Sequence, residues 1–450
     1  MFRRAASLLI LAGVLAAALP AAAQAARKTL VLRSAPVAMG GYNVAFPKLF
    51  VPAPKLDGYV VGMEARLVDT RGKVVTIRDV MLHHTVFYRR GAPESKSVCA
   101  GKTQEAFYGT GEEDEQLRLP PGYGYPVAKG DRWKMNAMLM SHSRRSVRVQ
   151  VEYAVTVETG VRLEPVIPLW VRANGCGDAV SYPVWGDGGP GGTDTRSFDW
   201  KVPFDARIVA VGGHLHGGSK DMFLTQQQCG GRKLLDTAPR YGMPDDLYYT
   251  ARPVLHEPGP VDTRYFLSKT GIQVRRGEIL KLTGLYDSSK PHTRVMSIMH
   301  VYLAKHAAPP AQDCAPLPAD AQELVKDEPV RLDPPDVTVP LNELSADGHT
   351  REITELPWPL SPLGNPATVA LKDNAFDPPY VQLKRDSQLT WSFDDEIAHN
   401  VTFASGPVLT GSPTLRGGET FTTRFTRTGR YELFCYLHPL AMHQVIDVVD

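Results

Sequence analysis

The sequence predicts an all-β protein built from consecutive sandwiches, and three observations support that fold class. Gly and Pro, 39 and 37 of the 450 residues, exceed their average combined share of roughly 12% and indicate many turns. Segments of alternating apolar and polar residues recur roughly every 8 to 12 residues, as in sandwich proteins. The hydrophobic fraction of 43% supplies real cores, and the length suits about three domains.

The amino terminus has the pattern of a secretory signal peptide. Arg3 and Arg4 precede an apolar run, and Ala23-Gln24-Ala25 follows it before Arg27. We expect cleavage near Ala25, so that residues 1–25 are removed on export. No later stretch has the length of a membrane span. The mature chain is therefore expected to be soluble and exported, either periplasmic or secreted.

Charge and cysteine content narrow the function classes. Fifty basic and 48 acidic residues give a net charge of +2, which indicates neither a nucleic-acid partner nor an anionic membrane surface. Export makes disulfides possible. If Cys435 is reserved for a metal, the four cysteines left can form two bridges in any of three pairings. These four are Cys99, Cys176, Cys229 and Cys314.

Strand patterns divide the chain into three β regions and one connecting arm. The first domain, residues 29–164, has strands expected at 59–68 and 148–157. The second, residues 165–305, has inner strands expected at 208–211 and 279–285. Residues 306–362 are rich in Pro and acidic side chains and are expected to form a linker with a short helix around 319–326. Residues 363–450 form the last domain.

The segment FCYLHPLAM at 434–442 predicts a mononuclear copper site. Cys435 is followed by His438 and then by Met442, and sulfur beside imidazole is a ligand set that binds copper in both oxidation states. His399 heads an alternating segment upstream and is the only histidine between His349 and Cys435. The predicted ligands are therefore His399, Cys435 and His438, with Met442 as the axial ligand.

This last domain resembles the cupredoxins, the plastocyanin and pseudoazurin family of blue copper proteins. Residues 374–378 (NAFDP) fit that family's early strand, and residues 417–419 (GGE) and 428–431 (TGRY) fit the turns before its copper loop. The resemblance implies a Greek-key sandwich that holds one type 1 copper.

Two groups of possible metal ligands lie in the first two domains. The first consists of the adjacent His83 and His84, with His142 after a later strand. Neighbouring strand residues point to opposite faces, so either the backbone bends there or only one of the two histidines binds. The second group consists of His214 and His216, which share one strand face, with Met296. A thioether in this group favours Cu(I).

The order and spacing of these ligands resemble those of the copper type II, ascorbate-dependent monooxygenases, the peptidylglycine alpha-hydroxylating and dopamine beta-monooxygenase family. His83 and His84 match its HH motif, and His142, after residues 119–125 (LPPGYGY), matches its third histidine. His214-Leu215-His216 matches its HxH motif and Met296 its methionine. The resemblance implies two jelly-roll-like β-sandwich domains before the cupredoxin sandwich, with up to two type 2 coppers.

Three positions depart from that family. Gly212 stands where the peptidylglycine enzyme has the arginine that holds the substrate carboxylate, and His300 and Ile298 replace its tyrosine and asparagine. An amidating activity on glycine-extended peptides is therefore not expected. Met299 competes for the thioether role, although strand parity places Met296 and Met299 on opposite faces.

Two other enzyme classes fit the sequence less well. Multicopper oxidases need several HxH motifs and histidines on both sides of the cysteine, whereas here Phe434 and Tyr436 flank Cys435. A zinc hydrolase needs a carboxylate base beside its ligands, and neither histidine group has an obvious one in the sequence.

The expected function is that of an exported copper oxidoreductase, an O2-dependent hydroxylating monooxygenase with a built-in blue-copper electron-transfer domain. The resemblance assigns electron transfer to His83, His84 and His142 and O2 activation to His214, His216 and Met296. Expected partners are a small-molecule or peptide substrate and an external reductant, either ascorbate-like or a redox protein. The alternative is a non-catalytic electron-transfer or copper-handling protein of the exported compartment.

Overall fold

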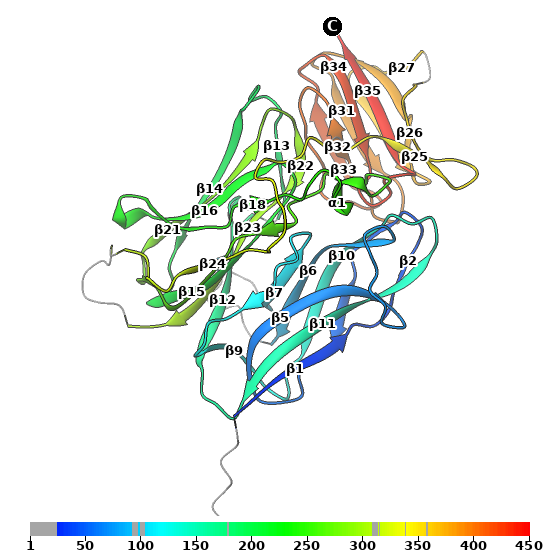
Figure 1. Ribbon diagram of the computed structural model, residues 1–450. Coiled ribbons are helices and arrows are strands. Elements are labelled where there is room, and N and C mark those ends of the chain that lie inside the picture. Colours follow the sequence, from blue (N-terminus) through cyan, green and yellow to red (C-terminus); the bar gives the residue numbers. More distant parts are fainter. Residues whose placement is uncertain are drawn as a thin grey trace, which may run out of the picture.

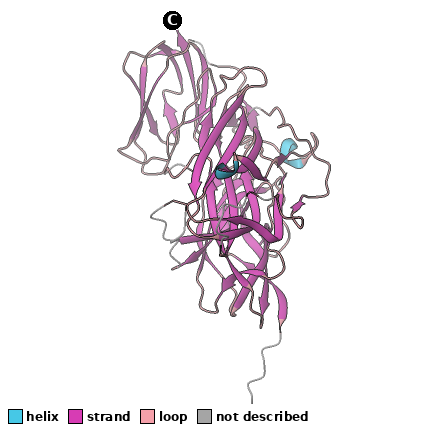
Figure 2. Ribbon diagram, turned by 90° about the vertical axis from the view of Figure 1, so that its left-hand side faces the viewer, coloured by secondary structure: helices cyan, strands magenta, loops and turns pink. Residues whose placement is uncertain are grey.

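Strands dominate the computed structural model, which describes residues 25–91, 98–99, 104–177, 180–307, 314, 316–337, 339–356 and 359–450. The predicted signal peptide, residues 1–25, lies outside the described residues except for its last position. Strands account for 53% of the structure and helix for 2%, and the predicted all-β class is confirmed (Figure 2). The helices described are α1 (Leu247–Thr250) and a 3-10 turn (Gln227–Cys229).

The first sandwich packs two antiparallel layers around one core. One layer has the order β1-β11-β5-β9, with β2 on β11 and β8 on β5, and the other has the order β3-β10-β6-β7, with β4 on β10. The strands are β1 (Ala26–Arg33), β2 (Val37–Met39), β3 (Val44–Ala45), β4 (Lys48–Val51), β5 (Gly58–Asp69), β6 (Val80–Arg90), β7 (Gln104–Gly111), β8 (Leu117–Arg118), β9 (Tyr123–Val127), β10 (Trp133–Ser141) and β11 (Val147–Thr159). The strands expected at 59–68 and 148–157 are thus confirmed as β5 and β11.

The second sandwich continues one layer of the first. A parallel pair between β9 and β12 joins the layers into an 11-stranded sheet, which runs on through β23, β15, β20 and β24, and β14-β21-β16-β17 covers it. These strands are β12 (Glu164–Arg172), β14 (Thr193–Lys201), β15 (Ala206–Leu215), β16 (Ser219–Gln226), β17 (Arg232–Asp236), β20 (Tyr265–Val274), β21 (Ile279–Asp287) and β23 (Ser297–Lys305). Short pairs are β13 (Tyr182–Val184) with β22 (His292–Val295) and β18 (Pro239–Arg240) with β19 (Asp262–Thr263). The inner strands expected at 208–211 and 279–285 are confirmed.

The connecting arm contains strands rather than the expected helix. Residues near 319–326 form β24 (Gln322–Leu324), which pairs with β20, so the helix prediction is wrong. The open edge of β20 supplies backbone partners, and such tertiary pairing overrides a weak helix propensity. Further along, β25 (Asn342–Leu344) pairs with β26 (Thr350–Glu352).

Two disulfides join Cys99 to Cys176 and Cys229 to Cys314. Of the three cysteine pairings that the sequence left open, this is the one observed.

The third sandwich closes the chain. Its layers are β27-β30-β35-β34-β32 and β29-β28-β31-β33. The strands are β27 (Ser361–Pro362), β28 (Ala367–Lys372), β29 (Ala375–Asp377), β30 (Tyr380–Lys384), β31 (Gln388–Phe393), β32 (Thr402–Ser405), β33 (Thr420–Arg424), β34 (Gly429–Phe434) and β35 (His443–Val449). None of the helices within the described part of the chain is long and apolar enough to cross a bilayer.

The third sandwich is docked on the other two (Figure 1). Leu440 and Tyr436, from the loop between β34 and β35, join an apolar cluster with Met81, Met138 and Leu255 of the first two sandwiches. Arg294, in β22, donates hydrogen bonds to Thr402 Oγ1 and the Ser412 carbonyl of the third sandwich. The predicted copper loop therefore faces the other two domains.

Candidate metal centres

The four ligands predicted in the third sandwich come together at one end of it. Cys435 follows β34, and its N–H donates to the Met442 carbonyl while the His438 N–H donates to the Cys435 carbonyl, which closes the loop. The His399 and His438 Nδ1 atoms lie 3.2 Å apart, and they lie 3.9 and 3.6 Å from Cys435 Sγ. Met442 is fully buried in the same core.

These distances fit a single copper ion. Bonds of about 2.0 Å to nitrogen and about 2.3 Å to sulfur hold trigonal ligands about 3.5 to 3.7 Å apart. Asp395 Oδ2 accepts a hydrogen bond from His399 Nε2 at 2.7 Å, so that His399 Nδ1 presents a lone pair to the site. Burial raises the pKa of the Cys435 thiol. Metal binding must therefore displace a proton from sulfur.

A β-bulge allows His83 and His84 to point to the same place. On β10, Met138 pairs with His84 and Leu139 with Leu82, which leaves His83 as the extra residue. The Nδ1 atoms of the two histidines consequently lie 3.3 Å apart. The backbone bend, one of the two alternatives left open by the sequence, is the one observed.

His214 and His216 also point together, as their spacing predicts. Their Nε2 atoms lie 3.1 Å apart, and two nitrogens on one ion with bonds of about 2.0 Å stand about 3 Å apart. Glu113 Oε1 accepts a hydrogen bond from His214 Nδ1 at 3.0 Å. That contact fixes the tautomer in which His214 Nε2 offers a lone pair, the usual carboxylate–histidine–metal arrangement.

The structure brings both histidine groups into one cluster between the first two sandwiches. The ring centroids of His83 and His216 lie 5.1 Å apart, and those of His84 and His214 lie 5.9 Å apart. His256, from the loop before β19, joins them with its ring 4.8 Å from that of His83. We refer to His83, His84, His214, His216 and His256 as the histidine cluster.

Acidic residues surround the histidine cluster, although neither histidine group has an obvious carboxylate neighbour in the sequence. Glu112 Oε1 lies 2.8 Å from His256 Nε2, and Glu112 Oε2 accepts a hydrogen bond from the Gly259 N–H. Glu115 Oε1 lies 2.9 Å from His300 Nδ1. The run GEEDE at 111–115 was visible in the sequence, but its place is set by the β7–β8 turn. Because Glu113 accepts a hydrogen bond from His214, it orients that histidine rather than standing free as a hydrolytic base.

Burial keeps most of these imidazoles neutral. It lowers the pKa of His83 and His216 well below the ordinary value, with neighbouring histidines adding to the effect, and it lowers the pKa of His84 to about 3. His214 differs: burial opposes its charged form, but Glu113 raises its pKa overall. Neutral imidazole is the form that ligates metal, so most of the cluster is ready to bind copper at neutral pH.

Two predicted ligands lie at the margins of this cluster. His142, next to the end of β10, hydrogen-bonds through Nδ1 to the Pro253 carbonyl at 3.0 Å, and its Nε2 is buried without a partner in the described structure. Burial and the neighbouring His256 lower its pKa to about 4. Met296 lines a cavity with His84 and His214, whereas Met299 is buried in the second core. The opposite faces expected for the two methionines are confirmed.

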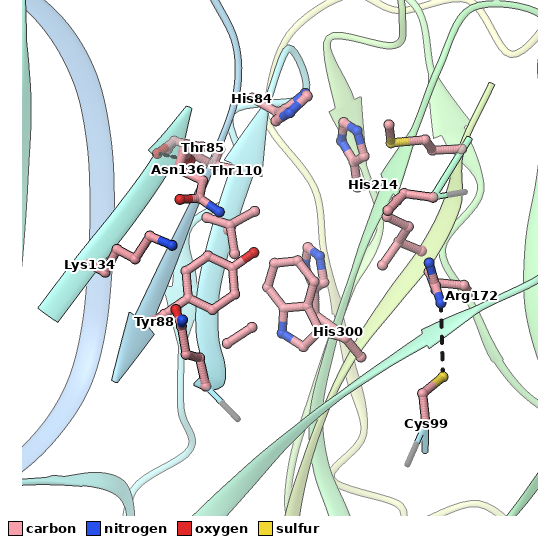
Figure 3. Close-up of a pocket in the computed structure, with 18 residues that line it drawn as sticks. His84, Thr85, Tyr88, Cys99, Thr110, Lys134, Asn136, Arg172, His214 and His300 are labelled. Atoms are coloured by element: carbon pink, nitrogen blue, oxygen red, sulfur yellow. Dashed lines mark hydrogen bonds between the residues drawn. The ribbon is translucent and has the colours of Figure 1, made fainter. Parts of the chain in front are cut away.

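A cavity of about 470 Å³ opens on one side of the histidine cluster. His84 and His214 lie at one end of it, and Tyr88, Lys134 and His300 line its remainder (Figure 3). Four buried polar atoms lining it have no partner within the described residues: Thr110 Oγ1, Asn136 Oδ1, Trp170 Nε1 and His300 Nε2. Cavities of this size, largely apolar with a few converging polar groups, are typical of small-molecule sites.

Gly212 is one of the three positions that differ from the copper monooxygenases, and the space beside it is filled by a neighbouring side chain. A Cβ built on Gly212 would overlap the Glu115 carboxylate. Glu115 in turn contacts His300, the second departing position. The space in which an arginine would hold a peptide carboxylate is therefore filled by an acidic side chain.

A second cavity, of about 280 Å³, borders the other three histidines of the cluster. His83, His216 and His256 line it, together with Arg294 and with Tyr436 of the copper loop. The histidine cluster therefore stands between a cavity of substrate size and the third sandwich.

Comparison with known proteins finds similarity to cupredoxins. No protein-family profile matches the chain. Amicyanin-alpha of Methylorubrum extorquens is 34% identical over 74 residues, which are 16% of this chain and 62% of that protein. A purple cupredoxin from Nitrosopumilus maritimus is 24% identical over 18% of this chain and 98% of its own, with a TM-score of 0.17. A reduced amicyanin variant is 22% identical over 19% of this chain and 82% of its own, with a TM-score of 0.18.

These comparisons reach only a small part of the chain. The chain spans 62% of the length of the curated amicyanin that it matches. The similarity gives no support to the resemblance between the first two domains and the copper monooxygenases. It supports a cupredoxin-like domain in this protein.

Proposed function

We propose that this protein is an exported copper oxidoreductase that uses O2 to hydroxylate a small organic or peptide substrate. The observation that carries the proposal is the position of the histidine cluster, with a cavity of about 470 Å³ on one side and the cupredoxin copper loop on the other. Copper bound at the cluster would supply one-electron transfer and the activation of O2. The chain supplies ligands, orientation and a shielded site.

His214 and His216 are the proposed ligands of the copper that activates O2; His214 lines the cavity of about 470 Å³, and Met296 is a third ligand from the wall of that cavity. Glu113 holds His214 in the ligating tautomer. The partnerless polar atoms of the cavity can hydrogen-bond a substrate, because a buried polar group without a partner is costly unless a ligand satisfies it. The cupredoxin domain would raise the local concentration of electron donor without a tight complex between separate proteins.

The test is O2 consumption by the copper-loaded full-length mature chain with a reductant and a panel of small organic and peptide substrates. We expect substrate-dependent uptake that a Met296→Ile variant loses while it keeps its blue colour. Met299→Leu, a change in the second core away from the cavity, is the matched control and should retain uptake. A chain that consumes no O2 with any reductant or substrate would instead be a non-catalytic copper carrier.

A further inference from the structure

Tyr436 leaves the third sandwich and contacts the histidine cluster. It directly follows the predicted copper ligand Cys435, and its hydroxyl lies 3.4 Å from His83 Nε2 and 3.7 Å from Met138 Sδ. Its backbone N–H donates to Asn400 Oδ1, and the Arg294 guanidinium lies 5.4 Å from the centre of its ring. Residues of all three sandwiches therefore hold Tyr436 in one orientation.

The His83 ring, which Tyr436 contacts, also lies beside a carboxylate, Glu112, and a second imidazole, His256. Ligand atoms of His83, Glu112 and His256 all lie within 4.8 Å of one another, and all three residues are buried. His83 Nε2 lies 3.6 Å and His256 Nε2 lies 2.8 Å from Glu112 Oε1. Bonds of about 2.0 to 2.2 Å place two ligands of one ion about 2.8 to 4.2 Å apart, so these separations fit a shared ion.

The hydrogen bond between the neighbouring histidines favours this use of His83. If His83 Nδ1 donates its proton to His84 Nδ1, 3.3 Å away, the Nε2 lone pair is left facing Glu112 and Tyr436.

We propose that His83, Glu112 and His256 hold a copper ion and that Tyr436 connects this ion to the Cys435 site. The inference rests on the proposed function for the identity of the metal, and it replaces His84 and His142 by Glu112 and His256 in the electron-transfer site. One electron leaves the Cys435 site, which is oxidised from Cu(I) to Cu(II), and reduces the His83 site from Cu(II) to Cu(I). No bond forms or breaks.

The electron-transfer route from Cys435 to His83 runs mostly along covalent bonds. From Cys435 it follows the backbone and side chain of Tyr436, and only the contact between the phenol and His83 is made through space. Electronic coupling falls more steeply through space than along bonds, so a single gap favours this route.

The experiment uses the copper-loaded full-length chain without oxygen. A pulse of one-electron reductant, substoichiometric to protein, reduces the blue site, and recovery of the blue absorption is followed at several protein concentrations. We expect recovery in the parent chain to be independent of concentration, as for a transfer within one molecule. Tyr436→Leu should make recovery concentration-dependent, and Tyr436→Phe should slow it. Tyr380→Phe, which removes a hydroxyl bonded to His443 in the same sandwich, is the matched control.

Copper content tests the ligand set separately. Glu112→Gln and His256→Gln should each lower ordinary, non-blue copper per chain by one ion while the blue band stays unchanged. Full copper content in both variants would overturn the site, and concentration-independent recovery in fully loaded Tyr436→Leu would overturn the route. Neither result depends on substrate turnover, so failure of the inference is distinguishable from failure of the proposed hydroxylation.

Discussion

The two candidate metal regions of this protein differ in how they are assembled. The ligands of the third sandwich lie between His399 and Met442 and are drawn together by one loop and its neighbouring strand. The histidine cluster draws on β6 of the first sandwich and on β15 and two loops of the second, and it forms only when those sandwiches pack. The comparison teaches that a local site can be identified from its own motif, whereas an interdomain site depends on the whole fold.

The two regions also differ in their acidic partners. In the third sandwich one carboxylate, Asp395, orients one histidine, and its side chain is 19% exposed. At the cluster the orienting Glu113 side chain is 0% exposed, and Glu112 and Glu115 lie beside it. Buried carboxylates interact more strongly with nearby charge than exposed ones. Metal affinity at the cluster should therefore depend more on its acids.

Cys435→Ser should have the largest effect, complete loss of the blue absorption. The substitution removes the thiolate on which that site depends while nearly conserving side-chain volume. Visible absorption and electron paramagnetic resonance of the copper-loaded variant would show this, and ordinary copper signals from the cluster should persist. Thermal unfolding of the metal-free parent and variant controls for the fold. Loss of both kinds of copper signal would show that the two regions are not separate sites.

His216→Gln should have the converse effect, because it removes one nitrogen of the chelating pair with His214. We expect one ordinary copper fewer per chain and an unaltered blue band. Metal analysis of the dialysed protein measures the first and absorption measures the second. His349→Gln, at an exposed turn of the connecting arm, is a control that should change neither. Unchanged copper content in His216→Gln would show that the His214 and His216 pair holds no copper ion.

Glu113→Gln should have an intermediate effect that sharpens the comparison. Loss of a carboxylate behind a ligating histidine typically costs about 10- to 100-fold in metal affinity. The matched change is Asp395→Asn in the third sandwich. Competition with a chelator would measure both, and the buried Glu113 should show the larger loss. An equal or larger loss at Asp395 would contradict the difference inferred between the two regions.

Lowering the pH should have the smallest of these effects, a gradual fall in the free energy of unfolding. In the folded metal-free chain the pKa values of His84 and His142 are about 3 and about 4, against 6.5 ordinarily. Between pH 6.5 and these values the unfolded chain binds more protons, so the free energy of unfolding falls as pH falls. Each pKa unit corresponds to about 1.4 kcal/mol. The raised pKa of His214 opposes this trend.

Thermal unfolding between pH 7 and pH 4 would test the direction of this effect. His142→Gln should flatten the dependence, because Gln carries no titrating ring. An identical slope in the parent and the variant would show that His142 titrates normally in the folded chain.

The sequence predicted the local features well and the interdomain ones less well. The ligands His399, Cys435 and His438 are close in sequence or lie at adjacent strand ends, and strand alternation placed the main strands. Glu112, Glu113 and His256 were missed because they lie in turns without periodicity, and only packing of the two sandwiches brings them to the histidines. The helix expected near 319–326 failed because the edge of β20 captured that segment as a strand.

Copper per chain of the purified mature protein, sorted by electron paramagnetic resonance into blue and ordinary sites, tests the central claim most directly. We predict one blue copper together with ordinary copper at the histidine cluster. Blue copper alone, despite excess Cu(II) during loading, would contradict a metal-binding cluster and leave the third sandwich as an electron carrier on a metal-free scaffold.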